Sequence, residues 1–282
     1  MTLLDPTKVR QLAASIDLRP AKQRGQNYVV DANTVRRIVT RSGIGVGDVV
    51  LEVGPGLGSL TLGLLETGAE VTAIEIEESC AQLLPHTVAE LQPGNAKQLR
   101  VVNADALQVN ELPGPPPTAV VANLPYNVSV PVLIHLFEAF GTWTKGLVMV
   151  QLEVADRLVA APGSKVYGVP SVKLAWFAEA ARVGIVPPTV FWPVPNVDSG
   201  LVSLTRREPP ITTVSRQQVF SLIDAAFAQR RKMLRAALAP IFGSSVRASD
   251  AIAAAGVDPT VRGEVLDIKD FVRIAEQAGD SL

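Results

Sequence analysis

Four consecutive residues, Asn123-Leu124-Pro125-Tyr126, combine groups that can hold an amine and a flat ring. They follow an apolar, β-branched run at 118–122 that has the composition of a buried strand. A plain turn after a strand favours Gly, Asp or Ser, so this combination indicates a binding role. The Asn123 side-chain oxygen and the Leu124 carbonyl can accept hydrogen bonds. Pro125 fixes its φ at about −65°, which holds the carbonyl's direction, and Tyr126 can stack on a base for ~1–3 kcal/mol.

Such a group of residues suits methyl transfer to the N6 amine of adenine. That amine is a poor nucleophile because its lone pair is delocalised into the ring. Acceptors directed at its hydrogens would help pull the nitrogen toward a tetrahedral geometry. No proton has to leave before the attack, so the chemistry needs no histidine base. We expect the rate to come from proximity, in-line alignment with a methyl donor and preorganised dipoles.

A glycine-rich turn at 52–58 follows an earlier candidate strand and opens directly into a helical pattern. Glycines at alternate positions, Gly54 and Gly56 among them, let the backbone approach a ligand closely. A dinucleotide-binding fold has the motif G-x-G-x-x-G/A at this turn, but here Ser59 occupies the position of the third glycine. Glu52 also precedes the glycines, and a carboxylate repels phosphates but attracts an ammonium group. The turn therefore favours S-adenosylmethionine over a dinucleotide.

Two further acids stand at predicted strand ends. Glu75 ends the second candidate strand, where it can accept hydrogen bonds from both ribose hydroxyls of a nucleoside. Asp105 follows the third, where it can accept a bond from an adenine amine. Taken alone, each acid could equally be a solvated group on the surface of the protein. Because ligands of parallel sheets bind outside the carboxyl ends of the strands, the three strand ends together predict a donor site.

The elements that must position these residues alternate along the chain. Strands alternating with helices predict a parallel α/β sheet covered on both faces, that is, a Rossmann-like methyltransferase fold with seven strands. Beyond residue 207 the pattern is helical only, which predicts a catalytic domain at 1–207 and a small all-α domain at 208–282. The candidate strands are 48–53, 70–75, 99–104, 118–123, 146–151, 182–187 and 200–205, and the candidate helices between them include 58–67, 78–91, 129–140 and 153–161.

The bulk composition excludes several classes of protein. No segment reaches the ~18 consecutive apolar residues of a membrane span, and the start of the chain lacks a secretory pattern. The single cysteine, Cys80, excludes an internal disulfide and a Cys-rich zinc site, and His86 and His135 have no ligand-type neighbours at metal spacing. The sequence predicts a cytoplasmic protein that needs no metal.

Charge is segregated along the chain. Residues 1–41 carry eight Lys and Arg against three Asp and Glu, and residues 206–247 carry eight against two, whereas residues 42–205 carry seven against fifteen. Such segregation suggests a polyanion held from two sides, although solvated helix faces would give the same counts. The helical periodicity of 215–242 places Arg230, Arg231, Lys232 and Arg235 on one predicted helix, as candidate phosphate contacts.

Several motifs together resemble the bacterial small-subunit ribosomal RNA adenine N6,N6-dimethyltransferases. The resemblance runs from about residue 20 to the end of the chain and includes the helical part. The motifs are GQNYVVD (25–31), EVGPGLGSLT (52–61), IEIE (74–77), NADAL (103–107), ANLPYNVSVPVL (122–133), QLEVADRLVAAPGSKVYGVPSV (151–172), VFWPVPNVDS (190–199) and AFAQRRKMLR (226–235).

The resemblance implies a function and a set of roles. It implies dimethylation of the N6 amines of two adjacent adenines near the 3′ end of small-subunit rRNA, late in subunit assembly, by a monomer. The donor would contact Asn27 and Val29, while Phe191 and Trp192 would pin a flipped adenine. Tyr28 departs from the more usual phenylalanine. The implied donor contacts also include Gly54, Gly56, Glu75, Asp105 and Asn123, and the implied RNA contacts are Arg230, Arg231, Lys232 and Arg235.

Two other functions remain open from the sequence. One is a large-subunit rRNA adenine methyltransferase of the macrolide-resistance type, against which the basic helical domain argues. The other is a ribosome-assembly factor that binds nucleic acid without needing catalysis. The intact 123–126 motif and donor-site acids count against an obligate non-enzyme, but they do not exclude a checkpoint role beside catalysis.

Overall fold

The computed structural model describes residues 3–18 and 27–278, and their contacts divide the chain into two compact units. The first unit contains the chain up to Ala155 together with Ala181–Arg206. The second contains Asp156–Ala180 and the chain from Arg207 onward. The second unit thus includes a segment that we placed in the first domain from its order in the sequence. Its helix α7 (Val169–Phe177) belongs there because Trp176 and Phe177 each meet the ring of Phe220 edge-on.

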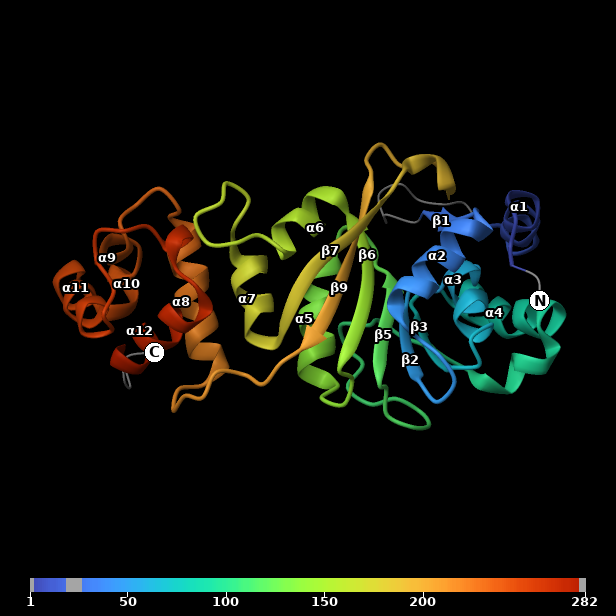
Figure 1. Ribbon diagram of the computed structural model, residues 1–282, viewed down its shortest axis with the longest axis horizontal. Helices are drawn as coiled ribbons and strands as arrows, with labels where there is room; N and C mark the ends of the chain where they lie inside the picture. Colours follow the sequence, from blue (N-terminus) through green and yellow to red (C-terminus); the bar gives the residue numbers. More distant parts are fainter. Residues whose placement is uncertain (1–2, 19–26, 279–282) are drawn as a thin grey trace. The chain divides into compact units, whose positions relative to one another are not determined.

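A seven-stranded sheet in the order β4-β3-β2-β5-β6-β9-β7 forms the centre of the first unit (Figure 1). Strands β2 to β6 run parallel, and β9 runs antiparallel to β6. The sheet is therefore mostly parallel, as predicted. The strands are β2 (Val49–Val53), β3 (Glu70–Glu75), β4 (Leu99–Asn103), β5 (Ala119–Asn123), β6 (Lys145–Gln151), β7 (Ala178–Val186) and β9 (Ser199–Arg206).

All seven strands lie close to their predicted ranges, but two short strands were not predicted. Strand β1 (Tyr28–Val29) pairs antiparallel with β8 (Phe191–Trp192), with Tyr28 opposite Trp192. The amide of Val30 extends this pairing by donating to the carbonyl of Val190 at 2.8 Å. The pairing joins the N-terminal motif to the aromatic loop, segments that are far apart in the sequence.

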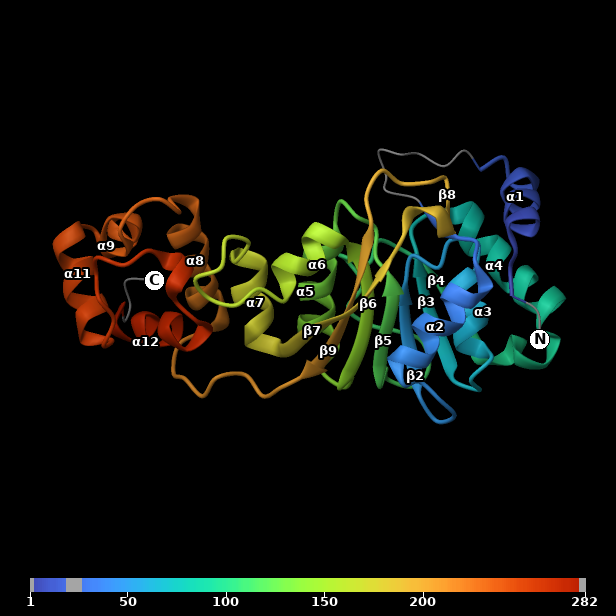
Figure 2. The same cartoon turned by 45° about the horizontal axis from the view of Figure 1, so that its top comes forward.

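Helices cover both faces of the sheet. From β2 the chain moves toward one edge of the sheet, passing through α3 and α4 to reach β4. From β5 it moves toward the other edge, passing through α5 to reach β6. Because both kinds of crossover are right-handed, α5 lies on the opposite face of the sheet from α3 and α4 (Figures 1 and 2). A Cβ on Gly63 would lie 2.5 Å from Val35, so glycine lets α2 and α3 pack closely. The helices are α1 (Pro6–Ser15), α2 (Ala32–Ser42), α3 (Ser59–Leu65), α4 (Glu78–Leu91), α5 (Ser129–Ala139) and α6 (Leu152–Leu158), with 3-10 turns at Pro93–Gln98 and Pro188–Val190.

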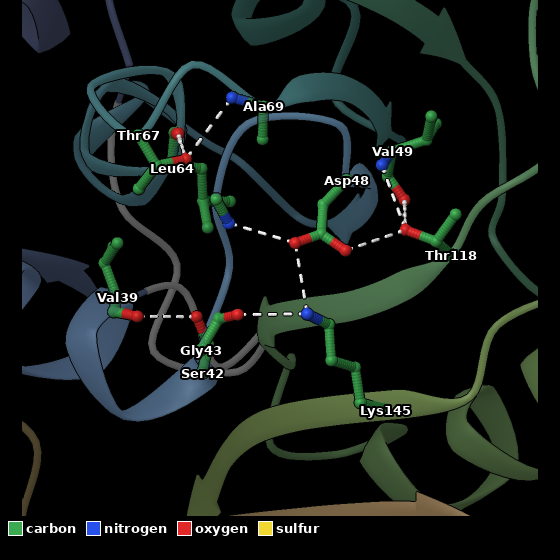
Figure 3. A network of polar contacts seen from close by, with 11 residues as sticks. Val39, Ser42, Gly43, Asp48, Val49, Leu64, Thr67, Ala69, Thr118 and Lys145 are labelled. Carbon is green, nitrogen blue, oxygen red and sulfur yellow. Dashed lines mark hydrogen bonds and ion pairs between the residues drawn. The ribbon is translucent and has the colours of Figure 1, made fainter.

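A polar network joins the amino ends of the central strands (Figure 3). The Asp48 carboxylate accepts hydrogen bonds from the Gly45 amide at 2.9 Å and from the Thr118 hydroxyl and Lys145 ammonium at 3.1 Å each. Lys145 also donates to the Gly43 carbonyl at 3.0 Å. Burial works to raise the pKa of Asp48, but these hydrogen bonds lower it on balance. These hydrogen bonds hold the amino ends of the strands together, so the network has a structural role.

The second unit is helical. The Tyr167 hydroxyl donates to the Leu266 carbonyl at 2.7 Å, and Phe227 lies between the rings of Tyr167 and the fully buried Phe271. Helix α8 is capped at its amino end by Ser215, whose side chain accepts from the amide of residue 218. Besides α7, the unit contains α8 (Arg216–Ala228), α9 (Leu234–Ala237), α10 (Ala239–Phe242), α11 (Ser245–Ala254), α12 (Ile268–Ala278) and a 3-10 turn at Gly263–Val265.

Candidate active site

The glycine turn between β2 and α3 has the left-handed backbone that its composition predicts. Gly54, Gly56 and Gly58 have φ values of 68°, 56° and 95°, a region that side chains with a Cβ seldom adopt. At Gly56 the space is also taken, because a Cβ there would lie 2.5 Å from Cε1 of Tyr28. The turn is therefore shaped jointly by its glycines and by the ring of Tyr28.

Glu75 lies at the end of β3, where its carboxylate meets the glycine turn. The amides of Gly56 and Glu77 donate to its two oxygens at 2.9 Å each. Burial raises the pKa of Glu75, and these backbone bonds oppose the shift. The side chain borders a cavity, so the remaining acceptor sites of the carboxylate face a ligand space.

Glu52 is the most deeply buried acid of this region, with 1% of its surface exposed. One of its oxygens accepts a hydrogen bond from the Thr61 hydroxyl at 2.7 Å. Burial raises the pKa of Glu52 to about 8, and the nearby Glu75 adds to the shift. The carboxyl is therefore mostly protonated near neutral pH, and a cation bound beside it would favour its charged form.

Asp105 follows β4, so a third strand end contributes an acid. One of its oxygens accepts from the amide of Leu107 at 2.9 Å, which fixes the side chain beside the cavity. The predicted order of acids along neighbouring strand ends, Glu52, Glu75 and Asp105, is what the structure shows.

Asn123 is the last residue of β5, and its two amide atoms have different environments. The nitrogen donates to the Asn27 carbonyl at 3.1 Å, whereas the oxygen is buried and accepts no hydrogen bond from any residue that the structure describes. Buried acceptors in folded proteins nearly always have a partner. The structure therefore presents an oriented acceptor whose partner must come from outside the described chain.

The rest of the 123–126 motif fixes this orientation. The Leu124 amide donates to the Met149 carbonyl on β6 at 3.0 Å, and the Pro125 carbonyl accepts from Val128 at 3.2 Å. The Tyr126 hydroxyl pairs with the Ser199 hydroxyl at 2.7 Å, and burial raises the pKa of Tyr126. The ring is thus held in place as a neutral phenol.

Two hollows meet at this motif. The first, a cavity of about 490 Å³, is bordered by Asn123, Pro125, the N-terminal motif, the glycine turn and the acids, with no Lys, Arg or His among its described lining residues. The second, of about 270 Å³, is bordered by Tyr126, Gln151 and the segment 194–197. Asn27 and Asn127 border both hollows. The 123–126 motif therefore lies on the same rim as the glycine turn, which is the placement that our interpretation required.

The predicted cofactor residues gather at the first cavity. Those that border it are Asn27, Val29, Gly54, Gly56, Glu75, Asp105 and Asn123. Gly25 and Gln26 of the N-terminal motif lie outside the described residues.

The two predicted base-holding aromatics do not border either hollow. Phe191 is buried in the core with 2% of its surface exposed, and Trp192 packs beside Tyr28 with ring centroids 6.3 Å apart. The pairing of β8 with β1 places Phe191 opposite Val29 and Trp192 opposite Tyr28. The next residues of the same loop, Val194 to Val197, border the second hollow instead.

The basic cluster of the second unit does not lie on one helix, so that prediction was wrong: Arg230, Arg231 and Lys232 lie in the connection between α8 and α9, and Arg235 lies on α9. Helix α8 ends at Ala228 and α9 begins at Leu234. The first amides of α9, those of Leu234 and Arg235, donate to the carbonyls of Val261 and Pro259 and not to the turn that a continued α8 would supply.

The members of this cluster also differ in their contacts. Arg230 donates to the Glu264 carboxylate and to the Lys165 carbonyl, both at 2.8 Å. Arg231 and Lys232 are exposed, and the structure gives them no side-chain partner among the described residues. Arg230 thus has a structural role whatever else it contacts.

Sequence reasoning missed Gln151 and the segment 194–197 as part of the site. Gln151 is the last residue of β6 and could have been found from its place at a strand end beside Asn123. The loop residues carried no such signal, because their position depends on the β1–β8 pairing.

No helix of the described chain is long and apolar enough to cross a membrane, and no cluster of His, Cys, Asp and Glu with metal-ligand geometry occurs in that part of it.

The sheet order, the glycine turn and the acid-lined cavity define a class I S-adenosylmethionine-dependent methyltransferase. Residues 19–280 match the family model described as ribosomal RNA adenine dimethylase. The chain belongs to this family, which confirms the resemblance inferred from its motifs.

Individual relatives agree with this assignment. The chain is 65% identical to ribosomal RNA small subunit methyltransferase A of Cutibacterium acnes, over 98% of this chain and 96% of that protein. Among solved structures, a dimethyladenosine transferase from Plasmodium falciparum superposes with a TM-score of 0.72 at 22% identity, covering 86% of this chain and 94% of that one. The 23S rRNA methyltransferase ErmE gives a TM-score of 0.64 at 27% identity, covering 89% and 98%.

Proposed function

We propose that the protein transfers methyl groups from S-adenosylmethionine to the N6 amines of two adjacent adenines near the 3′ end of small-subunit rRNA. The observation that carries the proposal is the buried, unpartnered oxygen of Asn123, which lies where the two hollows meet. The family and the 65% identical small-subunit enzyme support the substrate. The lower identity to ErmE, 27%, gives the large-subunit alternative less support.

The first cavity fits the donor by its chemistry. S-adenosylmethionine is a nucleoside with a sulfonium and an ammonium group, and it supplies an electrophilic methyl carbon. The cavity offers acids and no described base, which suits a cation. In our proposal Glu75 holds the ribose hydroxyls, Asp105 holds the adenine amine, and Glu52 lies nearest the charged amino-acid end. Ser59 adds to the same cavity a buried hydroxyl that bonds to no described residue.

The second hollow fits the acceptor base. Tyr126 supplies a ring fixed by Ser199, and stacking on such a ring offsets part of the few kcal/mol lost when a base leaves its stack. The 270 Å³ hollow adjoins the donor cavity through Asn27 and Asn127, so a base there would present its amine toward Asn123.

The residues of the chain then act mainly by positioning. The Asn123 oxygen accepts a hydrogen bond from the amine and orients its lone pair toward the methyl carbon. Its nitrogen is tied to Asn27, so this orientation is set before the base arrives. A preorganised dipole of this kind lowers the barrier because it needs no reorganisation during the reaction.

Contact with rRNA outside the active site falls to the second unit in this proposal. Arg231, Lys232 and Arg235 are the residues we assign to phosphate contacts, with Arg230 fixing the turn that carries them. We place the reaction in the cytoplasm, on an assembling small subunit, with the protein acting as a monomer and without a metal.

The test is incubation of the protein with labelled donor and small subunits from cells that lack this modification, followed by mapping of the labelled nucleotides. Label on two adjacent adenines near the 3′ end, in a ratio of four methyl groups per subunit, is the expected result. Label only at other positions of the small-subunit rRNA, or none at all, would contradict the proposal.

A further inference from the structure

The second hollow contains two primary amides that have no hydrogen bond to any other described residue, those of Gln151 and Asn196. Asn196 is exposed and is satisfied by solvent, whereas Gln151 is partly buried. A side-chain amide that bonds to no described residue keeps its donor and acceptor free for a ligand. Because Gln151 is partly buried at the end of a strand, it is the amide of this hollow best placed to offer a hydrogen bond in a fixed position.

The strand pairing places Gln151 beside the reacting centre. Asn123 on β5 pairs with Met149 on β6, and Gln151 follows two residues later at the tip of the same strand. Gln151 lies directly opposite Ser199 of the antiparallel strand β9. Residues opposite one another in such a pair project to the same face, and Ser199 holds the Tyr126 hydroxyl. The amide of Gln151 and the ring of Tyr126 consequently border one hollow.

A base in this hollow needs more than stacking and one amine contact. Stacking against Tyr126 confines the base to a plane but leaves it free to rotate within that plane, since stacking tolerates many orientations. A hydrogen bond from the amine to Asn123 fixes one point of the base. A second contact at a distance from the amine is needed to stop the rotation and aim the nitrogen lone pair.

We propose that Gln151 supplies this second contact by donating its side-chain N–H to a ring nitrogen of the target base, and so orients the base for methyl transfer. The inference rests on the proposed function and adds a substrate-orienting residue to it. Adenine ring nitrogens are hydrogen-bond acceptors, and Gln is a residue that proteins use to bind adenine edges. Because misorientation affects the attack more than the encounter, the loss should fall on kcat rather than on KM.

The test compares Gln151→Leu, Gln151→Glu and the parent protein on unmethylated small subunits with saturating donor. Gln151→Leu removes the donor and should lower kcat by roughly 10- to 100-fold, with little change in KM. Gln151→Glu keeps the shape of the side chain, but an ionised carboxylate has no hydrogen to donate. The loss of kcat in this variant should therefore become smaller as the pH is lowered and the carboxyl regains a proton. As a control, Gln82→Leu changes an exposed amide on α4 that binds only Glu78, and it should behave as the parent.

Folding and donor binding are measured separately for each variant. The thermal midpoint and the calorimetric donor dissociation constant should match those of the parent, because Gln151 does not border the donor cavity. A Gln151→Leu kcat within twofold of the parent, or a Gln151→Glu deficit that does not change with pH, would overturn the assignment. A parent protein that fails to methylate small subunits would instead contradict the proposed function.

Discussion

Replacing Asn123 by alanine should lower kcat strongly and weaken donor binding only slightly, because the side-chain oxygen and nitrogen make different contacts. The unpartnered oxygen is the acceptor for the target amine. Loss of one preorganised group of this kind costs about 2.7–4 kcal/mol of transition-state stabilisation, or roughly 10²- to 10³-fold in kcat. The nitrogen holds the Asn27 carbonyl at 3.1 Å. Loss of that bond, ~0.5–1.5 kcal/mol, should weaken donor binding only about 2- to 12-fold.

Single-turnover methylation of small subunits with saturating donor measures the effect on the rate of methyl transfer, and isothermal calorimetry measures the effect on the donor dissociation constant. Binding of small subunits should stay within a few fold of the parent, because the phosphate contacts are elsewhere. Asn110→Ala is the matched control: this exposed asparagine donates only to the nearby Gln108 carbonyl. Single-turnover rates of Asn123→Ala within threefold of those of Asn110→Ala would refute the role of the Asn123 oxygen.

Four other variants test separate parts of the protein. Glu75→Ala should raise the donor dissociation constant in calorimetry, and an unchanged constant would remove Glu75 from the ribose site. Because burial raises the pKa of Glu52 to about 8, Glu52 should stabilise the ligand-free fold most at pH below about 4.5, with this contribution lost as the pH rises toward 8. Glu52→Gln should flatten that slope in urea unfolding, and an unaltered slope would contradict the shift. Arg230→Ala should lower the free energy of unfolding by about 1 kcal/mol. The double variant Arg231→Ala with Lys232→Ala should leave that free energy unchanged and only reduce the salt dependence of RNA binding. The reverse pattern would contradict a structural role for Arg230 and a phosphate-binding role for Arg231 and Lys232.

Much of the active site could be predicted from the sequence because it depends on strand ends. In a parallel sheet the carboxyl ends of successive strands meet at one rim. Glu75, Asp105 and Asn123 each end or follow a run with an apolar, β-branched pattern, so their proximity follows from the fold class alone.

Features that depend on single tertiary contacts could not be predicted. Strands β1 and β8 contain two residues each and have no periodicity to detect, so the burial of Phe191 followed only from their pairing. The break after Ala228 is a similar case, because helical periodicity continues through the basic cluster. The amides of Leu234 and Arg235, which begin α9, donate to carbonyls at 261 and 259, and no local pattern specifies those partners.

The contact between Gly56 and the Tyr28 ring makes these two positions interdependent in evolution and in engineering. A methyl group at 56 would overlap the ring at 2.5 Å, in addition to the strain of its left-handed backbone. A smaller side chain at 28 would remove the overlap but not the strain. The combined effect of the two changes should therefore differ from the sum of their separate effects, and such epistasis restricts the paths by which the donor pocket can diverge.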